Sequence, residues 1–381
     1  MENSFAQDIV KHLTQMPNRA VASIYERQTL DFLSTLFSNK KIEKESFYSP
    51  KNYLITLTWL LLGVITSILI LDLFPIISLL LSVMFISMAF LFFNWMASPI
   101  SKFPPLVKTH NLVISELKKK PKKIVLMAHY DTAPISILYK PSLVGNFRKS
   151  LNFNILLLLL TEMMVIFHFL KPNIYTKGGL YILAVYFFIQ LFVASFDFFR
   201  FGYSNGASDN ATGVAAVAEV AKLVWEKNLK NTEIQILFTG AEEVGMLGAR
   251  FFLKKHFKEF DKNTMVINFD TLGAGNLNVI KKTGSWGTIT YDNDLVKISD
   301  EIIKNDQRFS HVKSGEWHTA DFDSVWFNRV GIPTLTLAAL DTNGRMPNIH
   351  RETDIYENVN FIPMNDAIAL AVKLCLKIDQ I

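Results

Sequence analysis

The sequence predicts an α/β protein with a largely parallel sheet, into which four membrane-spanning helices are inserted as two hairpins. Two observations predict this class. Short apolar, strand-like runs alternate with helix-like segments over most of the chain. Four further stretches are apolar over roughly 20 residues each, the length that crosses the hydrocarbon core of a bilayer. Half of the 381 residues are hydrophobic and 19% are charged, which excludes a disordered or fibrous chain.

The sheet is predicted from four apolar runs that are each followed by polar residues. These runs are 124–128, 233–238, 265–269 and 334–337. A helix is predicted from Thr212 to Trp225, because its apolar residues recur at helical spacing. The lone cysteine, Cys375, falls on the apolar face of a last helix, and one cysteine allows no intramolecular disulfide. In sheets of this kind the reactive groups collect beyond the carboxyl ends of the strands.

The four predicted spans form two pairs, at 53–71 with 74–96 and at 151–170 with 179–196. Lysines and arginines flank the outer ends of the pairs, whereas the turns within the pairs hold only Lys171 and Lys177. Basic flanks stay on the cytoplasmic side, so we expect a multi-pass protein of the cell membrane with its hydrophilic part in the cytoplasm. The lipid bilayer is then a partner. Glu162 in the third span is either a proton or substrate contact or an interhelical hydrogen bond.

The net charge of +5 does not indicate nucleic-acid binding. The basic residues gather in the short run 118–123 and beside the apolar stretches, as solvated loops and membrane flanks do. No nucleic-acid partner is therefore expected.

A metal site is predicted from polar residues that follow the strands. His129 and Asp131 leave the first strand on one face, so that an imidazole can bind a metal while a carboxylate holds its other nitrogen. Further candidates are Asp209, Glu242, Glu243, Asp270 and His350. Nitrogen and oxygen ligands without cysteine suit a hydrolytic centre with two metals. One carboxylate must bridge such a pair, and the spacing leaves open which one.

At these residues the sequence resembles the metallopeptidase family of two-zinc aminopeptidases, which also holds the glutamate carboxypeptidases and the glutaminyl cyclases. The resemblance lies in blocks that occur in the family's order, namely 111–114, 123–132, 206–214, 238–248, 268–270, 331–333 and His350. The opening, residues 8–47, is similar to the paired helices that begin this peptidase domain. The resemblance implies a zinc-exopeptidase-like fold in which helices flank the sheet.

The resemblance also implies the ligands. His129, Asp209 and Asp270 would bind one zinc ion, and Asp209, Glu243 and His350 the other, with Asp209 as the bridge. Another divalent ion can replace zinc. Glu242 would be the general base that activates water for peptide hydrolysis, and Asp131 would orient His129.

The sequence departs from the family around the last histidine. Many relatives have Tyr before this residue and Thr after it, whereas here Ile349 and Arg351 flank His350, so the tyrosine that usually helps at the oxyanion is absent from this position. Asp323 matches the family's acidic loop only approximately. His318 and Asp321 either line the substrate site or cap local turns.

These observations predict five segments: opening helices at 1–52, a hairpin at 53–97, the first strands at 98–150, a second hairpin at 151–199 and the catalytic remainder at 200–381. The predicted function is that of a membrane-embedded zinc aminopeptidase acting on peptides. A carboxypeptidase is an alternative that could bind a terminal carboxylate through arginines at 308, 329, 345 and 351. A glutaminyl cyclase, or a non-catalytic membrane receptor or scaffold with a peptidase fold, is also compatible with the sequence. The oligomeric state stays open.

Overall fold

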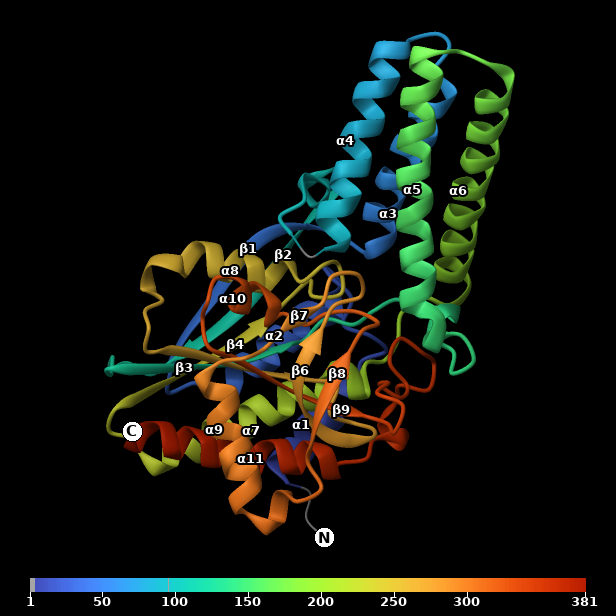
Figure 1. Ribbon diagram of the computed structural model, residues 1–381. Helices are drawn as coiled ribbons and strands as arrows, with labels where there is room; N and C mark the ends of the chain where they lie inside the picture. Colours follow the sequence, from blue (N-terminus) through green and yellow to red (C-terminus); the bar gives the residue numbers. More distant parts are fainter. Residues whose placement is uncertain (1–3, 95) are drawn as a thin grey trace.

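A twisted sheet forms the centre of the α/β part of the chain in the computed structural model, which describes residues 4–94 and 96–381 (Figure 1). Trp95, inside the second predicted span, lies outside the described residues. The described strands are β1 Lys41–Pro50, β2 Leu106–Ser115, β3 Lys122–His129, β4 Thr232–Thr239, β5 Thr264–Asp270, β6 Asn276–Thr283, β7 Ile289–Thr290, β8 Lys313–Trp317 and β9 Thr334–Leu340.

The four predicted strands form the middle of this sheet. Its order is β1-β2-β4-β3-β5-β9-β6-β7, with β8 paired to β6. The neighbours β4, β3, β5 and β9 run parallel, as the sequence predicted. Strands β1, β2 and β6 add antiparallel edges to this parallel centre. The carboxyl ends of the four central strands therefore lie along one edge.

Helices cover both faces of the sheet. Those on one face are α1 Phe5–Thr14, α2 Ile24–Thr35, α7 Thr212–Lys227, α9 Asp294–Asn305 and α11 Ile362–Gln380. Those on the other are α8 Leu247–His256 and α10 Val325–Arg329. Strand β3 packs against both layers, with Leu126 in the first cluster and Val125 and Met127 in the second, because successive side chains of a strand point to opposite faces.

The opening segment contains both helices and a strand. Helices α1 and α2 are the expected pair, but the segment from Lys41 belongs to β1 rather than to a helix. This segment is extended because it pairs with β2 along its whole length, a partner that lies beyond the first hairpin in the sequence.

The long apolar stretches form a four-helix bundle that projects from one side of the α/β part (Figure 1). Its helices are α3 Tyr53–Leu69, α4 Pro75–Phe93, α5 Phe147–Leu170 and α6 Ile174–Phe201. Both hairpin turns lie at the far end of the bundle, where Nε2 of His168 is 3.0 Å from a carboxylate oxygen of Asp72 and Lys177 also pairs with Asp72. A buried apolar cluster joins the four helices.

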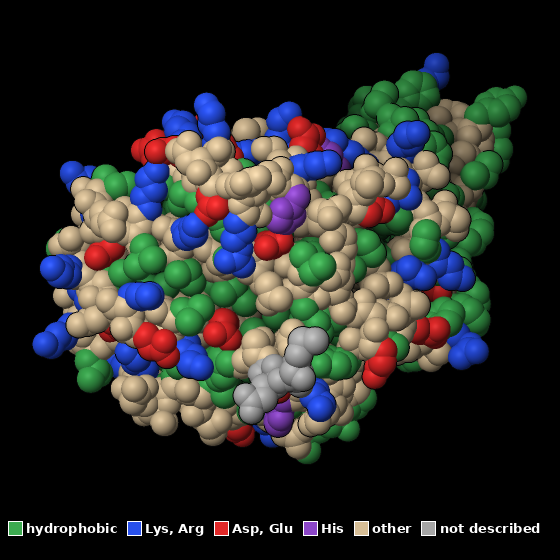
Figure 2. All heavy atoms as spheres, turned by 90° about the horizontal axis from the view of Figure 1, so that it is seen from below, with side chains coloured by type: hydrophobic (Ala, Val, Ile, Leu, Met, Phe, Trp, Pro, Cys, Tyr) green, Lys and Arg blue, Asp and Glu red, His purple; other side chains and the backbone are tan. Residues whose placement is uncertain are grey.

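Three of the four bundle helices are long and apolar enough to cross a membrane: α4, the α5 helix together with the short turn before it, and α6. Helix α3 is apolar but has 17 residues. Large apolar side chains on the bundle surface are exposed, among them Leu73 at 74% and Ile182 at 73%. In Figure 2 hydrophobic side chains, drawn in green, gather on the bundle, whereas lysines and arginines are spread over the α/β part. By length and composition, three helices of the bundle could therefore cross a membrane.

The bundle is connected directly to the edge of the sheet where the central strands end. In the sequence, helices α3 and α4 come between the paired strands β1 and β2. Helices α5 and α6 come between β3 and the tight turn Ala207–Ala211. The chain that enters the second hairpin therefore carries His129, and the chain that leaves it carries Asp209.

Candidate metal centre and active site

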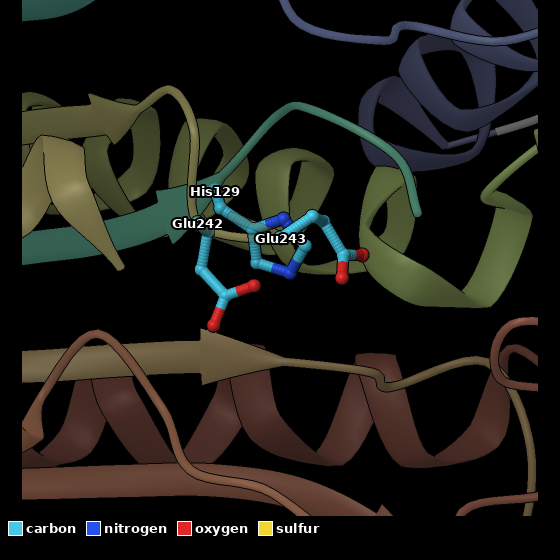
Figure 3. A group of neighbouring side chains, drawn as sticks. All are labelled: His129, Glu242 and Glu243. Carbon is cyan, nitrogen blue, oxygen red and sulfur yellow. The ribbon is translucent and has the colours of Figure 1, made fainter. Parts of the chain in front are cut away.

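The parallel strands bring three predicted site regions together. His129 is the last residue of β3, Asp270 is the last residue of β5, and Glu242 and Glu243 follow β4. Figure 3 shows His129, Glu242 and Glu243 close together, with the two carboxylates on different sides of the imidazole. A Cβ atom at Gly248 would clash with the carbonyl oxygen of Gly240, so only glycine lets α8 begin this close to the loop that carries the glutamates.

Asp209 lies between two histidines that are far apart in the sequence. Its Oδ1 is 3.1 Å from Nε2 of His129, and its Oδ2 is 3.2 Å from Nε2 of His350. Asp270 Oδ2 is 3.7 Å from the first of these nitrogens, and Glu243 Oε2 is 3.1 Å from the second. The structure thereby forms two adjacent sets of one histidine and two carboxylates that share Asp209.

Both sets fit a divalent metal ion. In each set the ligand atoms lie within 4.8 Å of one another. Ligands on a tetrahedral zinc ion are roughly 3.3 Å apart, because zinc lies about 2.0–2.1 Å from each nitrogen or oxygen. Oε1 of Glu243 is buried and, within the described residues, has no hydrogen-bond partner, which is costly unless a cation neutralises the carboxylate. The donor types, nitrogen and oxygen without sulfur, also suit zinc in a hydrolytic centre.

A contact at Nδ1 fixes the orientation of the His129 ring. Its Nδ1 is 3.2 Å from the backbone carbonyl oxygen of Asp131 and 3.8 Å from a carboxylate oxygen of the same residue. Donation from Nδ1 to the carbonyl leaves Nε2 free to face Asp209 and Asp270. The Asp131 carboxylate instead accepts the backbone N–H groups of Glu242 and Glu243, at 3.1 and 3.2 Å.

The electrostatics of the centre are those of crowded acids. Burial raises the pKa of Glu242, and the charge of Glu243 raises it further, although His129 lowers it. Burial lowers the pKa of His129 and His350, but the neighbouring carboxylates raise it more, so both histidines titrate well above their ordinary range. The carboxylates thus stabilise positive charge at the centre, either as protons on the two imidazoles or as a metal ion.

Unusual backbone conformations gather at the same loops. Ala241 before Glu242, Thr271 after Asp270, and His350 itself have φ angles of 55°, 48° and 53°, in the left-handed region that side chains other than glycine rarely adopt. Such conformations persist where the surrounding structure enforces them, often at functional sites.

Two buried charged residues that the sequence did not single out support these loops. Arg19 is fully buried and donates to the carbonyl oxygens of Tyr130, Asn205 and Gly206, at 2.8, 2.9 and 2.8 Å. Asp354 accepts the backbone N–H groups of Ser208 and Asp209, at 2.6 and 3.1 Å. Neither residue stands in a local pattern, and the only signal for Asp354 was its closeness to His350.

Tyr139 is a third neighbour that the sequence did not single out. It ends a short turn between β3 and α5, and its ring lies against that of His350, with centroids 4.2 Å apart. Burial raises the pKa of Tyr139, and the charges of Glu243, Asp209 and Glu242 raise it further.

The other predicted residues, His318, Asp321 and Asp323, have hydrogen-bond partners within the protein. His318 faces the carbonyl oxygen of Gly284 and the carboxylate of Glu316, each at 3.2 Å, and Asp321 accepts the hydroxyl of Thr283. The partners at 283 and 284 lie on another segment of the chain, so these contacts are not caps of a local turn, and His318 also lines a cavity of about 540 Å³. Asp323 is buried, accepts the hydroxyl of Thr239, and has its pKa raised to about 7 by burial.

Three of the four arginines considered for a terminal carboxylate have separate surroundings. Arg329 donates to the backbone carbonyl oxygen of Asn94 at 2.6 Å, and Arg308 lies over the ring of Phe309. Arg345 lines a cavity of about 540 Å³. These three side chains therefore do not form one cationic cluster.

The comparisons with known proteins give one family match in sequence and several solved structures with the same fold. Residues 189–373 match Peptidase family M28. Solved structures with the same fold include the Porphyromonas gingivalis glutaminyl cyclase, at 12% identity and a TM-score of 0.58 over 99% of this chain and 98% of that one. They also include the Legionella pneumophila LapA aminopeptidase, at 14% identity and a TM-score of 0.55 over 98% and 71%. A zinc-dependent exopeptidase from Parabacteroides distasonis has 14% identity and a TM-score of 0.54 over 97% and 95%.

No curated protein gives a significant match in sequence. The matched family segment nevertheless contains Asp209, Glu242, Glu243, Asp270 and His350, and the shared fold extends over nearly the whole chain. The family match and the shared fold confirm the class that the sequence motifs predicted, a metallopeptidase.

Proposed function

We propose that the protein is a membrane-embedded aminopeptidase that holds two zinc ions. The observation that carries this proposal is the position of Asp209, whose two carboxylate oxygens face two different histidines at 3.1 and 3.2 Å. One ion would be held by His129, Asp209 and Asp270, and the other by Asp209, Glu243 and His350. Bound zinc lowers the pKa of water and polarises a carbonyl group.

Glu242 is the general base in this proposal. It belongs to neither of the two sets that share Asp209, although it also lies near His129 and Glu243 in a third candidate group. In this proposal its carboxylate accepts a proton from the attacking water and returns it to the leaving amine. The backbone at this residue is held by the Asp131 carboxylate, which also bonds the next amide, so the base and the ligand Glu243 are positioned by one side chain. Asp131 positions His129 as well, through its carbonyl oxygen.

The charge of the site supports preference for a peptide amino terminus. Five predicted site carboxylates lie at one edge of the sheet, and a positively charged amine is attracted to them. Three of the arginines that could bind a terminal carboxylate, Arg308, Arg329 and Arg345, are dispersed.

We further propose that four helices cross the bilayer as two hairpins inserted in one peptidase domain, which is composed of 1–52, 98–150 and 200–381. Both hairpin turns lie at the end of the bundle remote from that domain (Figure 1). The basic flanks, including Arg148, Lys149 and Arg200, lie at the near end, which favours a cytoplasmic peptidase domain in the cell membrane.

The function is tested with purified protein in detergent and a panel of short peptides, each with a free and an acetylated amino terminus. We expect release of the first residue from free peptides only. Glu242→Gln should keep the metal and lower kcat at least 10²-fold, because general base catalysis contributes about 10²–10⁴-fold. The exposed Glu352→Gln is the matched control. Activity on acetylated peptides alone would overturn the amino-terminal assignment.

The topology is tested by labelling single cysteines introduced at Tyr175, next to the far turn, and at Lys262, on the peptidase domain, both of which are exposed. The natural Cys375 is buried and gives little background. In intact cells a membrane-impermeant reagent should label the first position only. Labelling of the second position alone would reverse the orientation.

A further inference from the structure

Tyr139 brings a phenol hydroxyl to the catalytic edge from the connection between β3 and α5. The residue is half-buried, and its ring packs on His350 at 4.2 Å between centroids and an interplanar angle of 40°. Within residues 4–94 and 96–381, its hydroxyl has no hydrogen-bond partner. A strong donor that no protein group engages, beside a cluster of buried carboxylates, is free to serve a ligand of the site.

The loop that carries Tyr139 is fixed at both the metal centre and the membrane bundle. The backbone N–H of Ser136 donates to the carbonyl oxygen of His350 at 3.1 Å. The backbone N–H of Ile137 donates to the carboxylate of Asp197, near the end of α6, at 3.0 Å. These bonds hold the loop next to His350. The ring of Tyr139 is therefore kept against this histidine by the backbone of its own loop.

Two other strong donors near the centre are already used. The hydroxyl of Tyr130 donates to the carbonyl oxygen of His110 at 2.6 Å, and the guanidinium of Arg19 donates to three backbone carbonyl oxygens. Ile349 and Arg351, the neighbours of His350, supply no phenol. In contrast to these two donors, the hydroxyl of Tyr139 is available to an acceptor on the substrate.

We propose that Tyr139 is a catalytic residue that donates a hydrogen bond to the carbonyl oxygen of the scissile peptide bond. This assignment rests on the proposed hydrolytic function. A phenol with an ordinary pKa of about 10 is protonated at neutral pH and is therefore a donor. A donor at this position is most valuable when the carbonyl oxygen gains negative charge, because the interaction is stronger in the transition state than in the bound substrate.

Bond formation and bond breaking balance in this step. The water oxygen forms a bond to the carbonyl carbon while one proton of the water moves to Glu242, and the electron pair of the C=O double bond moves to the oxygen that faces Tyr139. The C–N bond then breaks as this pair returns, and the proton held by Glu242 moves to the leaving nitrogen. Tyr139 keeps its own proton throughout and supplies only the hydrogen bond.

The test compares Tyr139→Phe with the wild type and with Tyr48→Phe, a control at a tyrosine that is 69% exposed on β1. Phenylalanine keeps the ring on His350 and removes only the hydroxyl. We expect kcat to fall about 10²-fold with little change in KM, since loss of one oxyanion donor costs about 10²–10³-fold. Metal content and unfolding temperature should stay at the wild-type values.

A second readout is the affinity of a peptide-like aminoalkyl boronic acid, which becomes tetrahedral in the site as the carbonyl carbon does during hydrolysis. Tyr139→Phe should weaken its binding by about the same factor as it lowers kcat/KM. An active wild type with a fully active variant would overturn the assignment of Tyr139 alone. A wild type that hydrolyses no peptide would overturn the proposed function together with this assignment. Loss of metal in the variant would instead assign a structural role.

Discussion

The carboxylate of Asp131 accepts a hydrogen bond from the backbone amide of Glu242 at 3.1 Å, and a second from the next amide, that of Glu243, at 3.2 Å. A single fully buried side chain thereby fixes the loop that carries the proposed base and a proposed ligand. Asp131 also contacts the end of β3, because its carbonyl oxygen faces Nδ1 of His129.

Asp131→Asn should lower kcat by about 10²-fold. The asparagine amide offers one oxygen where the carboxylate offers two, so the loop at 242 and 243 shifts, and small displacements of catalytic groups cost this much. One unsatisfied buried amide should also lower the free energy of unfolding by about 1–3 kcal/mol. Peptide hydrolysis and thermal unfolding in detergent check both effects. Wild-type kcat in the variant would show that the Asp131 carboxylate does not position the base.

Asp354→Asn should weaken metal binding by about 10–100-fold. Asp354 holds the backbone amides of Ser208 and Asp209, and loss of groups that orient metal ligands has effects of this size. Metal affinity is measured by competition with a chromophoric chelator. Asp379→Asn is the matched control, because this carboxylate also accepts two backbone amides, at Lys230 and Asn231, but far from the centre. Equal loss of affinity in both variants would contradict the prediction.

Metal affinity should rise with pH between about 6 and 8, by roughly tenfold per pH unit for each proton released. In the metal-free protein the carboxylates hold protons on His129 and His350, whose pKa is raised well above its ordinary value. A metal ion must displace these protons, so lower pH opposes binding. Zinc titrations at several pH values give the slope, and His311→Gln, remote from the centre, should leave it unchanged. A flat profile would show that both imidazoles are already neutral.

The free energy of unfolding of the wild type should fall as the pH rises through about 7, and Glu26→Gln should abolish this fall. Burial raises the pKa of Glu26 to about 7, although the hydroxyl of Thr109 and the backbone amide of Ala22 lower it. Because the folded protein holds this proton more tightly, the stabilisation is complete below about pH 4.5 and is lost as pH rises through about 7.

The size of this effect is roughly 3 kcal/mol at most. It is measured as the difference in free energy of unfolding between pH 4.5 and pH 8, for the wild type and Glu26→Gln, with the exposed Glu43→Gln as control. Parallel curves for the wild type and the Glu26 variant would mean that this carboxyl is ionised in the folded protein.

Much of the fold could be predicted from the sequence. The central strands and α7 are encoded by local apolar runs and helical spacing, and the predicted parallel arrangement is confirmed. Strand β1 was not predicted, because residues up to Phe47 were expected to belong to the opening helices. Lys41–Pro50 carries charged residues on its exposed positions and is held as a strand by pairing with Leu106–Ser115, a contact across the whole first hairpin.

The sequence by itself determined which residue types stand at the strand ends, because a strand and the polar residue that follows it are neighbours in the chain. Only the tertiary structure decided that Asp209 lies between His129 and His350, and that Arg19, Asp354 and Tyr139 support them. These contacts join segments that are remote in sequence. They are fixed by the pairing of parallel strands and by buried charges, which need hydrogen-bond or ion-pair partners. Neither can be predicted from the local periodicity of the sequence.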